Sequence, residues 1–217
     1  LGMNTIVLDI NQGAWKLETE RGVVMNGDKT EHLLEAIPVM GCYCDIIGVR
    51  AFAQFENKEF DYQETILNQF IQFSGKPVFS MEAATGHPLQ AFADLITIEE
   101  YKKTARPKVV LTWAPHPKAL PQAVPNSFAD FMNEADVEFV ITHPIGYELS
   151  EKFVRGAHVE YDQMKAFEGA DFIYAKNWAA YQDPNYGKIL STDRNWTVSD
   201  RQMAVTNNAY FMHCLPV

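Results

Sequence analysis

The alternation of two kinds of segment constrains this chain more than any other feature of its sequence. Short runs rich in β-branched and aromatic residues recur along its length, and segments with helical periodicity lie between them. One helical face carries Leu67 and Phe70, and another carries Leu89 and Phe92. The expected strands are residues 5–8, 45–49, 77–81, 109–113, 138–142, 171–174 and 209–212.

This alternation predicts an α/β fold of two lobes, each a parallel sheet flanked by helices, joined by an interdomain helix. The sequence TARPK near 104–108 separates a helical segment from the strand-like VVLTW. We therefore expect a first domain over 1–86, a connecting helix over 87–104 and a second domain over 105–217. A small-molecule site is expected at the carboxyl ends of the strands, in the crevice between the lobes.

The charge and the cysteine content exclude several classes of partner. A formal net charge of -10 disfavours nucleic acid, whose phosphates would repel the chain. No apolar run approaches the roughly 20 residues that a membrane-spanning helix needs, so no membrane partner is expected. The three cysteines are few, odd in number and without metal-like pairing, which is typical of a reducing compartment. We expect a cytoplasmic protein.

Titratable residues follow six of the seven expected strands. Polar side chains are common at strand ends because those ends meet solvent, so one such residue indicates little. Six together favour a shared pocket at one edge of the sheets. These groups are Arg50, Glu82, His116, His143, Lys176 and the pair His213–Cys214.

Three histidines precede proline, a pattern that usually ends an element because the residue before proline avoids the helical region. We interpret His143 in that way. His87 differs, because Pro88 suits the first position of the following helix. His87 is then expected at a helix N-terminus, where backbone N–H groups and the helix dipole favour an anion or a carbonyl oxygen, with Gln90 near the same mouth.

Other chemistries have weaker support in the sequence. A zinc hydrolase would use the histidines and Cys214, but no His-x-x-x-His or Cys-x-x-Cys spacing occurs, so no metal is expected. A nicotinamide dehydrogenase would fit the fold class, yet no Gly-x-Gly-x-x-Gly follows any strand. Cys214 is either a buried small hydrophobe or a site residue, and its place after the last strand beside His213 favours the site.

Several segments resemble one known family. HPLQ at 87–90 and MHCLP at 212–216 resemble the two signatures of ornithine transcarbamylases. The surrounding EAATGHPLQAFADL, TWAPHPK, FIYAKNW and VTNNAYFMHCLPV are most similar to the N-succinylornithine and N-acetylornithine branch of the aspartate/ornithine carbamoyltransferase superfamily. The resemblance covers essentially the whole chain.

That resemblance implies carbamoyl transfer from carbamoyl phosphate to the side-chain amine of N-succinyl-L-ornithine in arginine biosynthesis, without a metal or an organic cofactor. N-acetyl-L-ornithine is the alternative acceptor, and a non-catalytic relative that binds an acyl amino acid is a further alternative. It also implies a homotrimer with shared active sites, a carbamoyl phosphate-binding first domain and an N-acylornithine-binding second domain.

The same resemblance assigns roles to individual residues. Arg50, His87, Gln90 and Cys214 would be catalytic. The acceptor would be held by Thr30, Glu82, His116 and Lys176. The carbamoyl phosphate ligands would be Trp15 (from a neighbouring subunit), Arg50, His87, Gln90, Cys214 and Leu215.

The chain departs from the family pattern in four ways. It contains no Ser-x-Arg-Thr-Arg phosphate-binding segment, and it stops at Val217, before the Arg-Arg-Asn that usually follows. We expect both ends to be missing parts of the site, so that residues 1–217 alone are inactive while the full-length protein is an enzyme. Gly86 stands where relatives commonly carry arginine. Thr30 stands where proline accompanies succinyl substrates and glutamate accompanies acetyl substrates.

Overall fold

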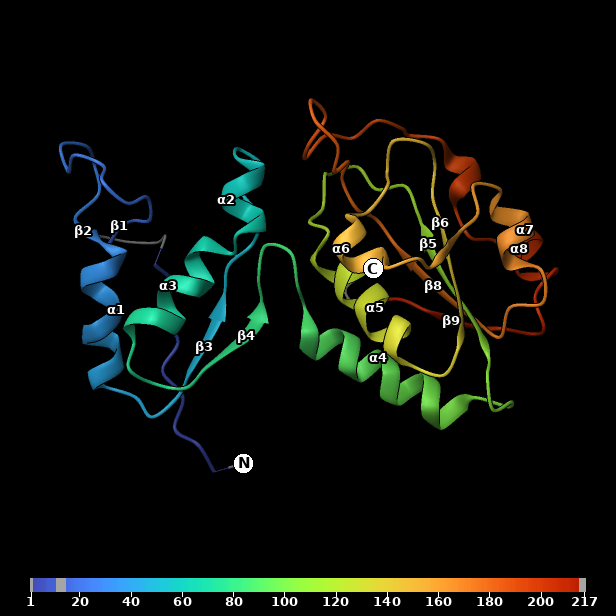
Figure 1. Ribbon diagram of the computed structural model, residues 1–217, viewed down its shortest axis with the longest axis horizontal. Helices are drawn as coiled ribbons and strands as arrows, with labels where there is room; N and C mark the ends of the chain where they lie inside the picture. The colour runs from blue at the N-terminus through green and yellow to red at the C-terminus, as the bar shows by residue number, and fades with distance from the viewer. Residues whose placement is uncertain (1, 11–14, 215–217) are drawn as a thin grey trace. The chain divides into compact units, whose positions relative to one another are not determined.

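The computed structural model describes residues 2–10 and 15–214 of the chain (Figure 1). Contacts divide it into two compact units, a smaller one of Leu1–Val49 and Thr65–Phe79 and a larger one of Arg50–Glu64 and Ser80–Val217. Both units combine helices with strands, so the predicted α/β class is confirmed. In the part that the structure describes, no helix is both long enough and apolar enough to span a bilayer.

The larger unit is built on a five-stranded parallel sheet with the order β7-β6-β5-β8-β9. Its register pairs Thr112 with Thr142, Trp113 with Lys176, and Tyr174 with Met212. The carboxyl ends of the strands therefore meet at one edge, as the sequence predicts. The strands are β5 (Lys108–Trp113), β6 (Glu138–Thr142), β7 (His158–Val159), β8 (Phe172–Lys176) and β9 (Tyr210–Met212).

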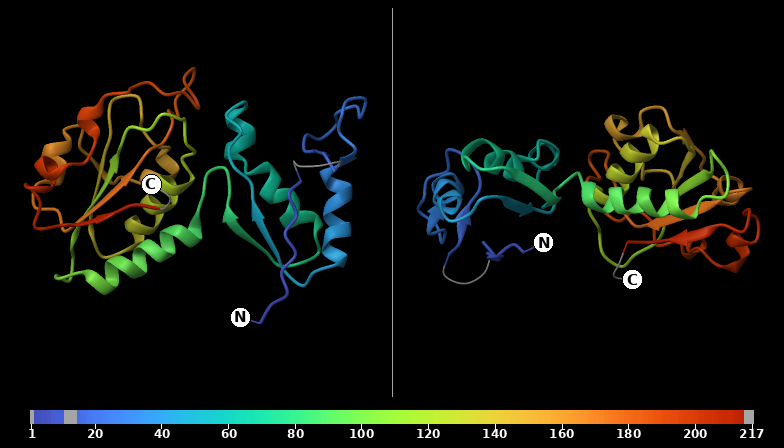
Figure 2. Two further views of the ribbon diagram at one scale, coloured as in Figure 1. Left: turned by 180° about the vertical axis from the view of Figure 1, so that it is seen from behind. Right: turned by 90° about the horizontal axis from the view of Figure 1, so that it is seen from below.

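Helices cover the five-stranded sheet (Figure 2), and alternating residues of the central strand β5 pack in two different hydrophobic clusters. Leu111 packs in a cluster with Ile98 and Phe128, whereas Val110 packs in another with Phe167. These side chains are 0% exposed, and burying each one stabilises the fold by roughly 1.5–3 kcal/mol. One layer holds α4 (Pro88–Tyr101), α5 (Ala123–Glu134) and α6 (Glu151–Val154), and the other holds α7 (Gln163–Phe167) and α8 (Asp200–Met203).

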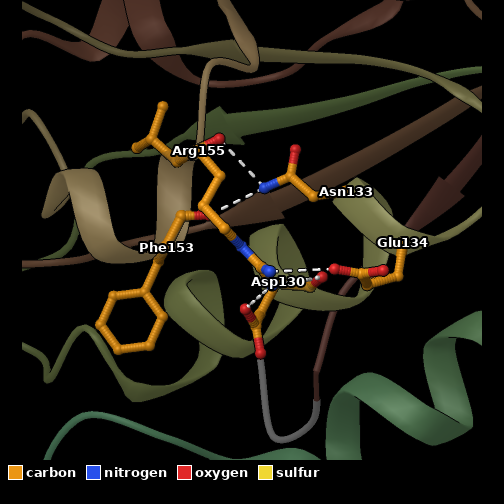
Figure 3. Close-up of polar contacts among 6 residues, drawn as sticks. Asp130, Asn133, Glu134, Phe153 and Arg155 are labelled. Carbon is orange, nitrogen blue, oxygen red and sulfur yellow. Dashed lines mark hydrogen bonds and ion pairs between the residues drawn. The ribbon is translucent and has the colours of Figure 1, made fainter.

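Arg155 connects α6 to α5 in the first layer (Figure 3). It ends α6 with a left-handed φ of 46°, and its guanidinium donates to Asp130 and to Glu134. Asn133 donates to the carbonyl oxygens of Phe153 and Val154 at 2.8 and 3.0 Å, which satisfies backbone acceptors at the end of α6. The ion pairs lie at the surface, so they contribute about 1 kcal/mol or less each.

The smaller unit contains short elements around one helix pair. The two-residue strands β1 (Leu17–Glu18) and β2 (Glu31–His32) pair in parallel, and α1 packs on α3. The strands β3 and β4 each begin in the smaller unit and end in the larger one. Ile47 N donates to Pro77 O and Ala51 N donates to Glu82 O, so the two paired strands run in the same direction. The remaining bounds are α1 (Leu33–Cys42), β3 (Ile47–Arg50), α2 (Lys58–Tyr62), α3 (Thr65–Phe73), β4 (Val78–Glu82) and the 3-10 helix η1 (Arg194–Trp196).

The prediction of a strand at residues 5–8 is wrong. Residues 2–9 form no strand in the structure, and Val7 is 85% exposed. A strand needs a neighbour for its backbone N–H and C=O groups, and an apolar, β-rich composition does not provide one. Conversely, β1, β2 and β7 have only two residues each, which is too short for a periodic pattern.

Candidate active site

The amino-terminal end of α4 presents His87 as the predicted cap. Pro88 occupies the first turn, and the Nδ1 atom of His87 accepts a hydrogen bond from the backbone N–H of Gln90 at 3.4 Å. The backbone N–H of His87 donates to Ser127 Oγ at 2.7 Å. One hydrogen bond therefore holds the ring of His87 and another holds its backbone. Because Nδ1 accepts, the proton of the neutral ring lies on Nε2, which is left as a donor.

The loop between β4 and α4 is held by residues that the sequence patterns did not single out. The Glu64 carboxylate accepts from the backbone N–H of Ala84 at 3.0 Å and from that of Thr85 at 2.7 Å. Asn126 donates to the carbonyl oxygen of Thr85 at 3.1 Å from the opposite side. These contacts join residues that are 20 to 41 positions apart, so no local sequence pattern predicts them. They fix the direction from which His87 enters the helix.

Arg50, Glu82 and His87 form one polar cluster at the ends of β3, β4 and the loop before α4. Arg50 Nη2 donates to Glu82 Oε2 at 3.1 Å, and His87 Nε2 lies 3.7 Å from the same oxygen. The Glu82 side chain is 11% exposed and that of Arg50 is 59% exposed. The Arg50 guanidinium also lies over the Phe52 ring, 4.8 Å from its centroid. A nearly buried carboxylate thus sits between a guanidinium and an imidazole donor.

The protonation of His87 follows from its surroundings. Burial lowers the pKa of His87, and the positive charges of Arg50 and Lys176 lower it further, while the Glu82 carboxylate opposes the shift. The ring is consequently neutral at and above neutral pH, with Nε2–H as a hydrogen-bond donor. A neutral donor can polarise a carbonyl oxygen without adding a full charge to the site.

Three further predicted residues gather at the carboxyl ends of β5, β8 and β9. Burial lowers the pKa of His213, and the charges of Lys176 and His116 add to that effect. The strands β5, β8 and β9 are neighbours in the parallel sheet, so these groups follow adjacent strand ends, and Lys176 lowers the pKa of both His213 and His87. His116 is exposed, and its Nδ1 atom accepts from the backbone N–H of Lys118 at 3.1 Å. At this edge Lys176 supplies a positive charge, which suits an acceptor with a carboxylate.

His143, the third strand-end histidine, belongs to the interior instead. It is 1% exposed, its ring packs edge-on against Tyr161 and Trp178, and its Nδ1 atom lies 2.9 Å from the carbonyl oxygen of Pro144. Burial lowers its pKa. This agrees with its interpretation as an element-ending residue, so the shared pocket does not include every strand-end group.

Cys214, which follows β9, lies in the hydrophobic interior of the larger unit. Cys214 is 9% exposed and is part of the hydrophobic cluster that includes Tyr174. Burial, together with Asp94 and then Cys214, raises the pKa of Tyr174 well above its usual range. Leu215, expected as a ligand, lies outside the described residues. The buried group Asp94 was not singled out by the sequence patterns, because an acidic residue within a helix usually faces solvent.

Trp15 and Thr30 lie together in the smaller unit, at one end of the β1–β2 pair. Trp15 Nε1 donates to Glu31 at 2.7 Å, and Thr30 N donates to the carbonyl oxygen of Lys16 at 2.9 Å. The two residues, far apart in the sequence, thus belong to one local structure. Trp15 is half-buried and Thr30 is exposed.

Two other expectations can be compared with the structure. A Cβ atom added at Gly86 would lie 3.5 Å from Ser127 Oγ, an ordinary contact, so the junction has room for a side chain there. Among residues 2–10 and 15–214, no three His, Cys, Asp or Glu side chains are grouped as metal ligands.

Known proteins are similar to this chain in sequence and architecture. Residues 1–100 match the carbamoyl-P binding domain of aspartate/ornithine carbamoyltransferases, and residues 121–217 match the Asp/Orn binding domain of the same family. An N-succinylornithine carbamoyltransferase of Bacteroides fragilis is 84% identical over all of this chain, which spans 68% of that protein. An N-acetylornithine carbamoyltransferase of Xylella fastidiosa is 37% identical over all of this chain, which spans 70% of that protein.

Solved structures agree with these matches. The crystal structure of an N-acetyl-L-ornithine transcarbamylase variant, with a glutamate replaced by valine, holds carbamyl phosphate and N-succinyl-L-norvaline. It superposes with a TM-score of 0.90 at 35% identity, covering 98% of this chain and 69% of its own. Two domain matches in order, the identity and the shared fold confirm the resemblance noted in the sequence: the chain belongs to the aspartate/ornithine carbamoyltransferase family.

Proposed function

We propose that the full-length protein transfers a carbamoyl group from carbamoyl phosphate to the side-chain amine of N-succinyl-L-ornithine. The products are N-succinyl-L-citrulline and phosphate, and the reaction belongs to arginine biosynthesis. The observation that carries the proposal is the cluster of Arg50, Glu82 and His87, with Glu82 Oε2 3.1 Å from Arg50 Nη2 and 3.7 Å from His87 Nε2. It lies in a chain 84% identical to an N-succinylornithine carbamoyltransferase.

The donor side of this site consists of Arg50, His87 and Gln90. A carbamoyl group presents one carbonyl oxygen and one amino group, so it needs a donor and an acceptor from the protein. His87 Nε2–H and the Arg50 guanidinium are donors suited to the carbonyl oxygen. The helix N-terminus behind His87 adds a favourable field for the negative phosphate. Gln90, in the first turn of α4, completes the carbamoyl contacts.

The acceptor side uses the charges of Glu82 and Lys176 together with the imidazole ring of His116. Glu82 attracts the amine of the acceptor, and its closeness to His87 brings that amine next to a carbonyl bound there. Lys176 attracts a carboxylate of an N-acylated amino acid, and the His116 ring offers it a hydrogen-bonding group. Holding both reactants together removes much of the entropy cost of a bimolecular step.

The reaction then consists of attack by the acceptor amine and loss of phosphate. The amine nitrogen forms a bond to the carbamoyl carbon, and negative charge develops on the carbonyl oxygen that faces His87 and Arg50. Each such preorganised donor typically stabilises the transition state by about 3–4 kcal/mol. The C–O bond to phosphate breaks, and phosphate leaves with the amine proton. Cys214, after β9, is assigned to the reacting centre.

The acyl group is sorted at Thr30, beside Trp15 of the same local structure. We infer a homotrimer in which these two residues complete the site of a neighbouring subunit. The glutamate-to-valine variant of N-acetyl-L-ornithine transcarbamylase that holds N-succinyl-L-norvaline supports an acyl-sorting position without a negative charge. Threonine is likewise uncharged and does not repel a succinyl carboxylate. The three free thiols support a cytoplasmic location.

The test is a carbamoylation assay of the full-length protein with three acceptors in parallel. N-succinyl-, N-acetyl- and free L-ornithine are each offered with carbamoyl phosphate, and the citrulline-type product is quantified. We expect the highest kcat/KM with N-succinyl-L-ornithine. Preference for the acetyl substrate would reassign the acyl group, and turnover of none of the three would favour a non-catalytic binding protein.

A matched variant connects the assay to Thr30. Thr30→Glu introduces a negative charge at an exposed position and should reduce turnover of the succinyl substrate, while Thr30→Val serves as the uncharged control. Equal loss in both variants would contradict the charge argument. Mass measurement in solution, by light scattering, would test the trimer separately.

A further inference from the structure

Asp94 is a buried carboxyl group on α4 to which the proposed reaction gives no role. It lies one helical turn after Gln90 and is only 6% exposed. Burial raises its pKa to about 6, and the hydrogen bond from Gln90 offsets only part of that shift. Among the described residues, no cation contributes to the shift. A buried carboxylate without an ion pair destabilises the fold, and such groups concentrate at functional sites.

The contact between Asp94 and Gln90 determines the orientation of an amide. Gln90 Nε2 donates to Asp94 Oδ1 at 2.9 Å. An ionised carboxylate can only accept hydrogen bonds, so the nitrogen of the amide must face it, because the reverse orientation would bring two oxygens together. Gln90 Oε1 is then the atom left to accept from a ligand.

The backbone of Gln90 acts on His87 in a complementary way. Its N–H group donates to His87 Nδ1 at 3.4 Å, which leaves Nε2–H as the donor of that ring. The first turn of α4 therefore presents one fixed donor and one fixed acceptor. A carbamoyl group carries a carbonyl acceptor and an amino donor in one plane, so the two patterns match.

We propose that Asp94 is a positioning residue that fixes the Gln90 amide so that its oxygen accepts a hydrogen bond from the amino group of the carbamoyl donor. The inference rests on the proposed function, because it requires a ligand with N–H at that point. The fixed Gln90 amide makes the site selective for carbamoyl phosphate. An analogue with methyl in place of the amino group can accept a hydrogen bond from His87 but cannot donate one to Gln90. Without Asp94, the Gln90 amide can turn and the selectivity falls.

The first experiment compares two ligands on the full-length protein. Dissociation constants are measured for carbamoyl phosphate and for acetyl phosphate, which replaces the amino group by methyl, in wild type, Asp94→Leu and Glu99→Gln. Glu99 is an exposed carboxylate on the same helix, paired with Lys102, so it is the matched control. We expect Asp94→Leu to reduce the preference for carbamoyl phosphate about tenfold. The control should keep the wild-type preference.

The ratio separates positioning from a merely structural role. Loss of helix stability would weaken the binding of both ligands by the same factor, which leaves the ratio of their dissociation constants unchanged. An unchanged ratio would therefore overturn the proposal. Wild-type protein that binds neither carbamoyl phosphate nor acetyl phosphate, and that carbamoylates no acceptor, would instead contradict the proposed function. Wild type that discriminates, with Asp94→Leu discriminating equally, contradicts only the role of Asp94.

A reciprocal pair keeps the test valid if Asp94→Leu fails to fold. Gln90→Glu alone places two carboxylates in contact and should lose most of the preference. In the double variant Gln90→Glu/Asp94→Asn, the new asparagine amide donates to the new glutamate, whose second oxygen still accepts from the ligand. We expect the double variant to recover at least fivefold of the preference lost by Gln90→Glu. A double variant no better than Gln90→Glu would overturn the proposal.

Discussion

Two corners of the larger unit have the same dipeptide, His-Pro, and very different surroundings. At the start of α4, the His87 side chain is 22% exposed and lies among Arg50, Glu82 and Lys176. After β6, His143 is 1% exposed and lies among aromatic rings. Burial lowers the pKa of both rings, but only His87 keeps a donor facing charged groups. The comparison teaches that access and neighbouring charge, rather than residue type, distinguish a candidate site from a structural corner.

The largest expected effect is on activity, at the α4 corner. His87→Ala removes the Nε2–H donor and should lower kcat/KM of the full-length protein about 10²–10³-fold, which is typical of losing one preorganised donor. Steady-state kinetics with saturating acceptor would measure it, and thermal unfolding would verify the fold. A loss smaller than about tenfold in a folded variant would remove His87 from the chemistry.

The β6 corner should respond in stability instead. His143→Ala deletes a buried ring and should lower the free energy of unfolding by about 2–4 kcal/mol, through the cavity that it leaves. Urea unfolding measures this change, and the folded fraction should keep kcat/KM within about threefold of wild type. If activity fell far more than stability, the two corners would not differ as described.

Asp94 should support function at the expense of stability, unlike His143, which should support stability alone. Its pKa is raised from 3.8 to about 6, so the folded state binds the proton more tightly and stability falls as pH rises from about 4 to about 6. Asp94→Asn removes this penalty and should raise the free energy of unfolding at pH 8 by about 1–3 kcal/mol. Denaturant unfolding at pH 8 and pH 4.5 would measure the change. A variant equally destabilised at both values would indicate a stabilising role.

The pH dependence of stability offers a smaller test of the buried corner. The pKa of His143 is lowered from 6.5, so the unfolded chain binds the proton more tightly and stability falls as pH drops below about 6.5. Between pH 7.5 and 5.5 this contributes at most about 1.4 kcal/mol. His143→Gln should reduce the decline, as measured by paired urea titrations. An undiminished decline would show that His143 is not its source.

The smallest effect concerns Gly86, which precedes the α4 corner. An added Cβ meets only Ser127 Oγ at 3.5 Å, so Gly86→Ala should raise the free energy of unfolding by about 0.4–1 kcal/mol through reduced freedom of the unfolded chain. Thermal unfolding would detect the gain. A destabilised variant would mean that the junction has less room than this geometry provides.

Local patterns predicted the parts of this protein that depend on local rules. Pro88 at the first helical position predicted the His87 cap, and the long apolar strands predicted the five-stranded sheet except for β7. The apolar run at 5–8 failed because a strand depends on a partner. Three residues hold the loop before α4 and the backbone of His87: Glu64, Asn126 and Ser127. Their partners are 20 to 41 residues away in the sequence, so hydrophobic periodicity does not predict these contacts.

Asp94 illustrates the same limit from another side. Its four-residue spacing from Gln90 is visible in the sequence, but its burial is not, and the burial is what turns an ordinary i, i+4 pair into a candidate positioning contact. Trp15 and Thr30 are similar, since only the β1–β2 pair brings their loops together.

The most direct test of the central claim is carbamoyl transfer itself, measured side by side in wild type, His87→Ala and His143→Gln of the full-length protein. Carbamoyl phosphate and N-succinyl-L-ornithine are supplied, and N-succinyl-L-citrulline is quantified by mass spectrometry. The account predicts product from wild type and from His143→Gln, and at least a hundredfold less from His87→Ala. No product from wild type, or equal rates in His87→Ala and wild type, would contradict it.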